Sequence, residues 1–254
     1  MKILGCDYDG TLYLDEKVSI EDRKAIKTFR NNGGIFGIVT GRCLSMILGE
    51  LNNLQICFDF LILCNGGFIL DKHLNTIDKK DIDYQTGLDL IGFLQEEEAR
   101  FGVTDGNRFY RYAHPKVAEQ HRRPFINEIK VSLEDIIDNK IFTSFFYRHQ
   151  DVEKTLKGIE KIKERYQESL SYHYNGGTLD INGAEVSKEA AISKISKHFN
   201  TTNIYTIGDN YNDINMINRY YGFAMEQGVT EAKANAKHVV KSVAEAISII
   251  NGLK

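Results

Sequence analysis

Two carboxylates stand close together directly after a short apolar segment near the start of the chain. The apolar run Ile3 to Cys6 is followed by residues 7–11, which read DYDGT. Where a strand breaks into a loop, both Asp7 and Asp9 can turn toward one ligand, and Gly10 permits the sharp turn. One carboxylate can then attack as a nucleophile while the other gives a proton to a leaving group. Taken alone, these five residues also fit an ordinary acidic loop with two solvated carboxylates.

A hydroxyl and a glycine follow the next apolar segment, Ile35 to Val39. Thr40 and Gly41 lie there, and a hydroxyl with free backbone N–H groups suits a phosphate. In isolation, Thr40 as the N-cap of a following helix is an equally good interpretation. Lys188 opens a predicted helix and, by itself, indicates no more than a solvated lysine.

A third polar group, residues 208–213 (GDNYND), comes directly after another apolar segment. Its carboxylate and amide oxygens, joined to those of Asp7 and Asp9, could form an oxygen-only Mg²⁺ site. The seven histidines are dispersed without H-x-x-x-H spacing, which argues against a histidine-based zinc site.

The polar groups all follow short apolar segments, and helices are predicted between those segments. Residues 19–32 predict a helix that Ser19 caps and Gly33 ends. Short apolar strands separated by helices indicate a parallel sheet covered on both faces, with its ligand beyond the carboxyl ends of the strands. The sequence therefore predicts an α/β fold with a Rossmann-like parallel sheet core. Further strands are predicted at 60–64, 203–207 and 222–225, and further helices at 44–51, from 213 and at 243–250.

The pattern changes between about residues 83 and 181. Turn signals at 105–107 (DGN) and 175–177 (NGG) each predict a hairpin. We therefore expect a core domain formed by residues 1–82 and 182–254, interrupted by an inserted α+β cap domain at 83–181. Its other predicted elements are helices at 84–100, 115–127 and 151–168 and a strand at 141–147.

Composition argues against several classes of partner. The 254 residues are 42% hydrophobic and 26% charged, with a formal net charge of −3. The basic residues are scattered, unlike the stripe that nucleic-acid binders show, and no apolar run approaches the roughly 18 residues of a membrane span. The four cysteines form no C-x-x-C pair, so we expect reduced thiols and a cytoplasmic location rather than a disulfide framework.

Taken together and in this order, the polar groups resemble the four motifs of the haloacid dehalogenase-like hydrolase superfamily. Residues 7–11 resemble the first motif, Thr40 the second, Lys188 the third and residues 208–213 the fourth. The inserted domain falls between the second and third motifs, where class II caps lie in that superfamily.

Finer features are similar to the Cof-type subfamily. They include Asn65 with Gly66 and the segment 179–188 that leaves the inserted domain. Tyr8 stands where Leu or Phe is commoner, and the tail after Ser242 is shorter than usual.

The resemblance implies a Mg²⁺-dependent phosphatase acting on a small phosphorylated metabolite such as a sugar phosphate. It implies that Asp7 attacks phosphorus and forms an aspartyl-phosphate, while Asp9 acts as acid and then as base. Mg²⁺ would be held by Asp7, the backbone carbonyl of Asp9 and Asp209. The implied phosphate-binding residues are Thr40, Gly41, Lys188 and Asn212, and Asp213 would position Lys188 or a metal-bound water.

Two other functions stay open. Sugar phosphomutases share this core and cap type, and a non-catalytic module could hold a phosphorylated ligand. A dehalogenase would not need Asp209. No motif in the cap specifies the substrate; the candidates for contacting it, because they lie near predicted strand ends, are Arg111, Tyr112, Arg148 and His149.

Overall fold

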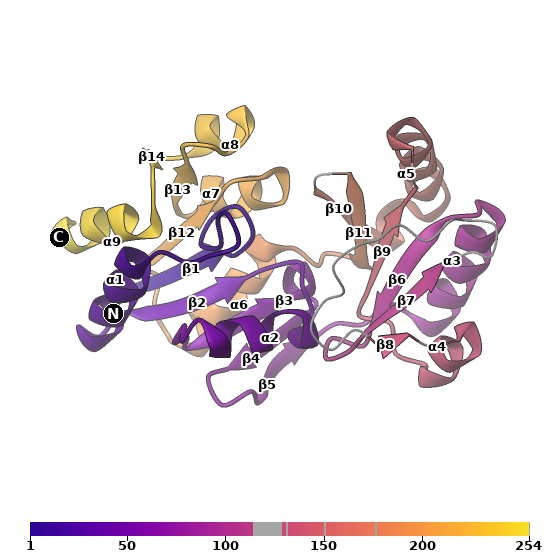
Figure 1. Cartoon of the computed structure of the whole chain (residues 1–254), viewed down its shortest axis with the longest axis horizontal. Helices are drawn as coiled ribbons and strands as arrows, with labels where there is room; N and C mark the ends of the chain where they lie inside the picture. The colour runs from indigo at the N-terminus through magenta and orange to yellow at the C-terminus, as the bar shows by residue number, and fades with distance from the viewer. Residues whose placement is uncertain (114–128, 131, 150, 176, 254) are drawn as a thin grey trace.

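The computed structural model describes residues 1–113, 129–130, 132–149, 151–175 and 177–253. Within these residues the strands form two separate sheets, which Figure 1 shows side by side, each with its own helices. The larger sheet consists of β1 (Ile3–Asp7), β2 (Ile35–Val39), β3 (Phe60–Leu63), β4 (Phe68–Asp71), β5 (Thr76–Lys79), β12 (Ile204–Gly208), β13 (Tyr221–Met225) and β14 (His238–Val240).

In the larger sheet the described strands run in the order β14-β13-β12-β1-β2-β3-β4-β5. Neighbours from β14 to β3 pair in parallel, which confirms the α/β core. At the other edge, β4 and β5, which were not predicted from the sequence, extend the parallel core with antiparallel pairs. The three-residue turn η1 (Cys64–Gly66) joins β3 to β4, and so short a connection cannot make the crossover that parallel strands need.

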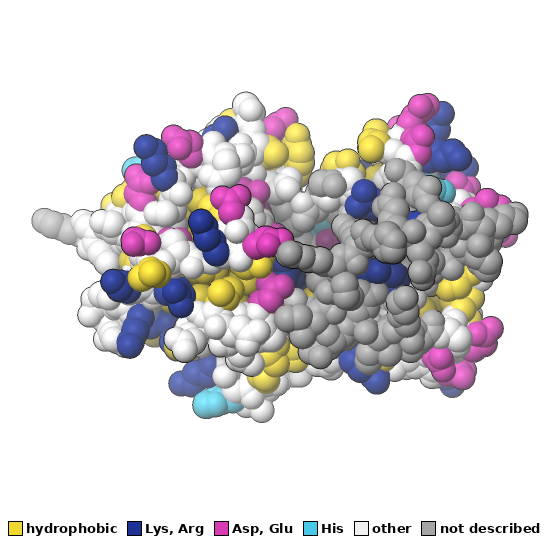
Figure 2. Space-filling view, in the orientation of Figure 1, with side chains coloured by type: hydrophobic (Ala, Val, Ile, Leu, Met, Phe, Trp, Pro, Cys, Tyr) yellow, Lys and Arg dark blue, Asp and Glu magenta, His cyan; other side chains and the backbone are white. Residues whose placement is uncertain are grey.

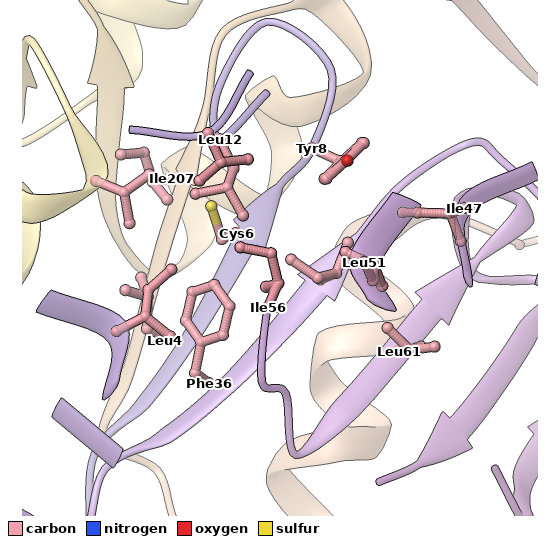
Figure 3. Packing of buried hydrophobic residues seen from close by; sticks show 14 of the residues in the cluster. Leu4, Cys6, Tyr8, Leu12, Phe36, Ile47, Leu51, Ile56, Leu61 and Ile207 are labelled. Carbon is pink, nitrogen blue, oxygen red and sulfur yellow. The ribbon is translucent and has the colours of Figure 1, made fainter. Parts of the chain in front are cut away.

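Helices cover both faces of this sheet. They are α1 (Ile20–Asn31), α2 (Leu44–Asn53), α6 (Lys188–His198), α7 (Ile214–Arg219), α8 (Thr230–Asn235) and α9 (Val243–Gly252). Alternation along β1 sends Leu4 and Cys6 into one apolar cluster and Ile3 into another. The first cluster, seen in Figure 3, is closed by side chains of α1, α2 and α9, and the second by those of α6 and α7. As predicted, α1 follows Ser19, whose hydroxyl accepts the backbone N–H of Asp22.

The smaller sheet belongs to the inserted segment. Its strands are β6 (Arg100–Thr104), β7 (Phe109–Ala113), β8 (Ile129–Lys130), β9 (Ser144–Arg148), β10 (Leu170–Asn175) and β11 (Thr178–Gly183), and its helices are α3 (Tyr84–Glu96), α4 (Leu133–Asn139) and α5 (Val152–Tyr166). Both predicted hairpins are present, β6 with β7 and β10 with β11. Side chains of α3 and α5 pack with one face of this sheet in a third apolar cluster that includes Leu90, Ile159 and Phe145.

Two predicted segments of the cap have boundaries that differ from the prediction, and a third cannot be compared. Helix α3 ends at Glu96 rather than near residue 100, because Glu98 adopts a left-handed φ of 50° and Arg100 already begins β6. Strand β9 begins at Ser144, three residues later than predicted. The helix predicted at 115–127 lies outside the described residues.

The surface reflects the nearly balanced composition. Figure 2 shows acidic and basic side chains interspersed on the face that it presents. None of the helices in the described ranges combines the length and apolar character needed to cross a membrane. Cys6, Cys43 and Cys64 are buried and Cys57 is exposed, and all four are free thiols.

Candidate functional site

Three parallel strands end side by side at one edge of the larger sheet. Strand β1 lies between β12 and β2, and its last residue, Asp7, is paired with Val39. Thr40 directly follows β2 and Asp209 directly follows β12. The structure therefore brings Asp7, Thr40 and Asp209 to neighbouring strand ends, where parallel sheets bind their ligands.

Lys188 reaches this edge from a different part of the chain. It is the first residue of α6, which Ser187 caps by accepting the backbone N–H of Ala190. Its side chain is 1% exposed, and Nζ donates to Asp7 Oδ1 at 2.6 Å and to Asp213 Oδ1 at 2.7 Å. Burial lowers the pKa of the ammonium, but the two carboxylates outweigh burial and hold the pKa above its ordinary value. Lys188 is thus a buried cation, not the solvated lysine that its sequence position alone allowed.

Asp213 is fully engaged in hydrogen bonds. Besides accepting from Lys188 through Oδ1, it accepts the backbone N–H groups of Asp209 and Asn210 through Oδ2, each at 3.1 Å. Gly208 makes room for it, because a Cβ at that position would lie 2.5 Å from the Asp213 Cβ. These contacts fix Lys188 and the loop after β12 relative to each other.

The acidic groups at this edge fit a divalent cation. One carboxylate oxygen from each of Asp7, Asp209 and Asp213 lies within 4.8 Å of the others. Asp7 Oδ2 is buried and accepts no hydrogen bond from the described residues. Burial and the nearby Asp213 charge raise the pKa of Asp7, and they raise the pKa of Asp209 to about 6. A hard cation such as Mg²⁺ binds oxygen ligands and would both satisfy the lone oxygen and offset the crowded negative charge.

Asp209 is held against the loop that follows β1. Its Oδ1 accepts the Thr11 hydroxyl at 2.9 Å. Gly10 has a φ of +87°, and a Cβ there would lie 2.5 Å from Asp209 Oδ2. Only glycine combines that backbone conformation with so close an approach, so the first and fourth motifs meet at Gly10.

Asp9 lies apart from the acidic cluster. Arg42 donates to both of its oxygens, from Nε at 2.8 Å and from Nη2 at 2.5 Å. Arg42 also donates to Glu50 at 3.0 Å and lies over the ring of Tyr8, 5.0 Å from its centre. The Asp9 side chain is 42% exposed. The sequence suggested two carboxylates turned toward one ligand, whereas here Asp9 is turned toward an arginine to which sequence reasoning gave no role.

The loop after β2 is held by the turn η1. Helix α2 is capped at Cys43, without a side-chain hydrogen bond, so the interpretation of Thr40 as an N-cap is wrong. The Thr40 hydroxyl accepts the backbone N–H of Arg42 at 3.2 Å, and the Thr40 carbonyl accepts the backbone N–H of Asn65 at 3.0 Å. Thr40 is 2% exposed.

Asn65, Asp180 and Asn182 reach the site without having been assigned a role from the sequence. Asn212 Nδ2 donates to Asn65 Oδ1 at 3.2 Å, and Asn65 Nδ2 donates to Asp180 Oδ2 at 2.9 Å. Asn182 Nδ2 donates to the carbonyl of Cys64 at 3.0 Å. The similarity of Asn65-Gly66 and of the segment 179–188 to Cof-type sequences was the signal that could have found them.

The residues predicted to contact the substrate from the cap do not all lie on one face of the smaller sheet. Tyr112 packs against Phe101, with ring centres 4.7 Å apart, next to the apolar cluster of that sheet. His149 lies edge-on to Tyr147, and burial lowers its pKa. Arg111 and Arg148 are half-buried, and alternation along their strands places them on the face opposite that cluster.

Comparison with known proteins agrees with this architecture. The family model for haloacid dehalogenase-like hydrolase matches residues 4–253. A 5-amino-6-(5-phospho-D-ribitylamino)uracil phosphatase of Bacillus subtilis is 26% identical over 254 residues, covering 99% of this chain and 91% of that protein. A second Bacillus subtilis phosphatase of the same name is 27% identical over 274 residues, covering 95% of this chain and 93% of that protein. A solved HAD/COF-like chain from Plasmodium vivax shares the fold with a TM-score of 0.87 at 23% identity, covering 100% of this chain and 96% of that one.

Proposed function

This chain belongs to the haloacid dehalogenase-like hydrolase family, and from that premise we propose that it is a Mg²⁺-dependent phosphatase of the Cof type. Its substrate would be a small phosphorylated metabolite, and Asp7 would carry the phosphoryl group between two steps. One observation supports this most: the buried Asp7 carboxylate accepts from the Lys188 ammonium, lies within 4.8 Å of an Asp209 carboxylate oxygen and keeps an oxygen with no hydrogen-bond partner among the described residues.

In the proposed reaction Asp7 is the nucleophile, and Asp9 is first the acid and then the base. A carboxylate oxygen of Asp7 bonds to phosphorus while the P–O bond to the leaving group breaks, and the leaving oxygen takes a proton from Asp9. In the second step Asp9 takes a proton from a water molecule, whose oxygen bonds to phosphorus. The bond to Asp7 breaks, and inorganic phosphate leaves.

Asp7, Asp209 and the backbone carbonyl of Asp9 would hold Mg²⁺ in this account. When bound, the cation offsets the repulsion between an anionic nucleophile and a phosphate dianion. Asp213 would act as a positioning residue, because both of its oxygens already accept hydrogen bonds from Lys188 and from two backbone N–H groups.

The Asp9 side chain must leave its ion pair with Arg42 before it can give a proton to a leaving group. Both of its oxygens are engaged by the guanidinium, so we infer a second side-chain position that is reached when a substrate is present. Exposure of the Asp9 side chain permits this movement, since water can replace the guanidinium contacts.

Phosphoryl oxygens would be bound by groups from three segments of the chain. Thr40 and Gly41 would offer a hydroxyl and backbone N–H, Lys188 a charge, and Asn212 an amide N–H. Such donors, fixed before the substrate arrives, stabilise the charge that develops during transfer.

The proposed substrate class rests on the named relatives and on the position of the cap in the sequence. The two Bacillus subtilis proteins are named as phosphatases of a phosphorylated ribitylamino-uracil, and we propose a substrate of comparable size. The cap would be residues 83–181 and the core residues 1–82 and 182–254, with Arg111 and Arg148 as candidates for contacting the leaving group. The cytoplasmic location expected from cysteine usage remains a proposal.

A phosphate-release screen tests this function directly. The panel contains sugar phosphates, nucleotides, pyridoxal phosphate, flavin mononucleotide and 5-amino-6-(5-phospho-D-ribitylamino)uracil. We expect release with Mg²⁺, loss of activity after EDTA, recovery with Mg²⁺ and little recovery with Ca²⁺, whose longer bonds and extra ligands suit this chemistry poorly. Full activity after exhaustive EDTA treatment would contradict the metal assignment. Transfer of phosphate within a sugar bisphosphate, without release, would indicate a phosphomutase instead.

A further inference from the structure

Asn65 joins three parts of the molecule that are far apart in sequence. Its backbone N–H donates to the Thr40 carbonyl at 3.0 Å, its Oδ1 accepts from Asn212 at 3.2 Å, and its Nδ2 donates to Asp180 at 2.9 Å. The side chain is fully buried. A single residue therefore links the loop after β2 through its backbone, and the turn after β12 and strand β11 of the smaller sheet through its side-chain amide.

The direction of these hydrogen bonds is set at Asp180. An ionised carboxylate can only accept, so the Asn65 amide must present its NH₂ group to Asp180 and its oxygen to Asn212. That oxygen in turn requires Asn212 to present its own NH₂ group. Because an NH₂ group has two N–H bonds, Asn212 keeps one for another acceptor.

Strand β11 holds the turn η1 at two points. Asp180 and Asn182 are two residues apart and therefore lie on one face of the strand; Asp180 binds the Asn65 side chain and Asn182 binds the Cys64 carbonyl. Cys64 and Asn65 have φ values of 50° and 53°, a left-handed conformation that costs energy in most residues and that asparagine tolerates better than most. Backbone strain of this kind persists where the surrounding contacts over-determine it.

The loop after β2 lies so close to Asn65 and Asp180 that a side chain at Gly41 would have no space. A Cβ at Gly41 would lie 2.7 Å from Asp180 Oδ2 and 3.2 Å from Asn65 Nδ2. The backbone that would bind phosphate thus packs directly on the Asp180–Asn65 pair.

We propose that Asp180 and Asn65 form a buried relay that orients the Asn212 amide, so that an N–H is directed at the phosphoryl group. Both are positioning residues, and the proposal rests on the proposed function because it requires phosphate at Asn212. It also makes one strand of the smaller sheet part of the phosphate site.

The surroundings of Asp180 make the relay sensitive to protonation. Burial raises the pKa of this carboxyl to about 7, the hydrogen bond from Asn65 and the charge of Lys188 lower it, and the charge of Asp9 raises it. A protonated Asp180 could donate, and Asn65 would then no longer be compelled to direct its NH₂ group toward it. Experiments on the relay therefore belong at pH 8, where the carboxylate form prevails.

Exchanging the two side chains gives the sharpest test. Asp180→Asn alone lets the amide at 180 face either way, and Asn65→Asp alone opposes two carboxylates. The double variant Asn65→Asp/Asp180→Asn restores one consistent direction, since the carboxylate at 65 accepts from both neighbours. Aspartate, like asparagine, tolerates the left-handed backbone at position 65, which alanine would not do.

The readout is inhibition by inorganic phosphate in the presence of Mg²⁺, beside Asn212→Ala as the benchmark. We expect about a tenfold loss of phosphate affinity in each single variant, as for one hydrogen bond to a charged group, and recovery to within about threefold in the double variant. Asp89→Asn, which removes a half-exposed carboxylate paired with Arg165 on the smaller domain, should leave affinity unchanged.

Results that contradict the relay differ from results that contradict the proposed function. Wild-type affinity in both single variants, or a double variant no better than the weaker single variant, overturns the relay. If Asn65→Asp does not fold, the double variant must still bind phosphate more tightly than Asp180→Asn. A wild-type protein that neither binds nor releases phosphate contradicts the proposed function itself, whatever the variants do.

Discussion

The two acidic residues of the first motif have opposite surroundings. Asp7 is buried, bound to Lys188 and close to Asp209, whereas Asp9 has a 42% exposed side chain that Arg42 holds through both carboxylate oxygens. Only one residue, Tyr8, separates them in sequence. The buried carboxylate accepts a hydrogen bond from the buried Lys188 ammonium, and losing that partner inside the protein is costly. The exposed carboxylate can exchange its partner for water at little cost.

This difference matches what the two proposed roles require. A nucleophile gains from a fixed position close to the phosphorus atom. A group that first gives a proton and then takes one from water must move between partners. Variants of Asp7, Asp9 and Lys188 test whether the burial of Asp7 and the exposure of Asp9 have these consequences.

The largest effect is expected for Asp7→Asn. We predict that turnover falls on the order of 10⁴-fold or more, because no other group in the account can attack phosphorus. The fold should survive, since Lys188 keeps Asp213 as a partner. Steady-state kinetics and circular dichroism measure both; substantial activity in a folded variant would remove Asp7 from the role of nucleophile.

Asp9→Asn should have a smaller effect that depends on the leaving group. With an alkyl phosphate we expect a loss of about 10² to 10⁴-fold, the usual contribution of an acid or base. With p-nitrophenyl phosphate the first step should suffer much less, so rapid quenching should show a burst of p-nitrophenol before slow turnover. Equal losses for both kinds of substrate would make Asp9 a structural or metal-binding residue.

The free energy of unfolding should respond differently to substitutions beside the buried Asp7 and at the exposed Asp9. Lys188→Met leaves Asp7 and Asp213 buried without their cation, and we predict a decrease of about 3 to 5 kcal/mol in the free energy of unfolding. Asp9→Asn, which removes one half-exposed partner of Arg42, should change it by less than about 1 kcal/mol. Urea unfolding compares them, and similar losses would show that the exposed pair is also structurally important.

Asp180 provides a smaller test based on pH. Its pKa of about 7 exceeds the ordinary value because of burial, so the folded state retains a proton that the unfolded state loses from about pH 4 upward. Stability supplied by this proton should therefore fall as the pH rises toward 7 and change little above it. Relative to wild type, Asp180→Asn should gain stability over that interval, by a few kcal/mol at most. Urea unfolding of both proteins at pH 5 and pH 8 measures this difference. An equal difference in the free energy of unfolding at the two pH values would contradict the raised pKa.

Local sequence patterns predicted five of the eight described strands of the larger sheet, together with its polar edge, but not β4, β5 or β14. The strand before Asp7 and the helix capped by Ser19 depend on neighbouring residues, and the structure has both. The antiparallel strands after Gly66 were missed, because four-residue strands joined by a short turn give little periodic signal.

Contacts between distant segments could not be predicted in the same way. The ion pair of Arg42 with Asp9 joins residues 33 positions apart, and the hydrogen bond of Asn65 with Asp180 spans 115. Each pairing depends on how the strands are ordered and on which side chains face one another. The motif resemblance pointed to Asp7, Lys188 and Asp209, which the structure brings together. It assigned no role to Asn65 or Asp180 and did not predict the direction in which Asp9 turns.

In the proposed mechanism the phosphoryl group passes through Asp7 between the two steps. Rapid acid quenching of Asp9→Asn with p-nitrophenyl phosphate, followed by peptide mass spectrometry, tests it most directly, because the second step is slowed in that variant. We expect one phosphoryl group per chain, located on Asp7 and formed at the rate of the burst. A burst with no covalent phosphate, or with phosphate on another residue, would contradict it.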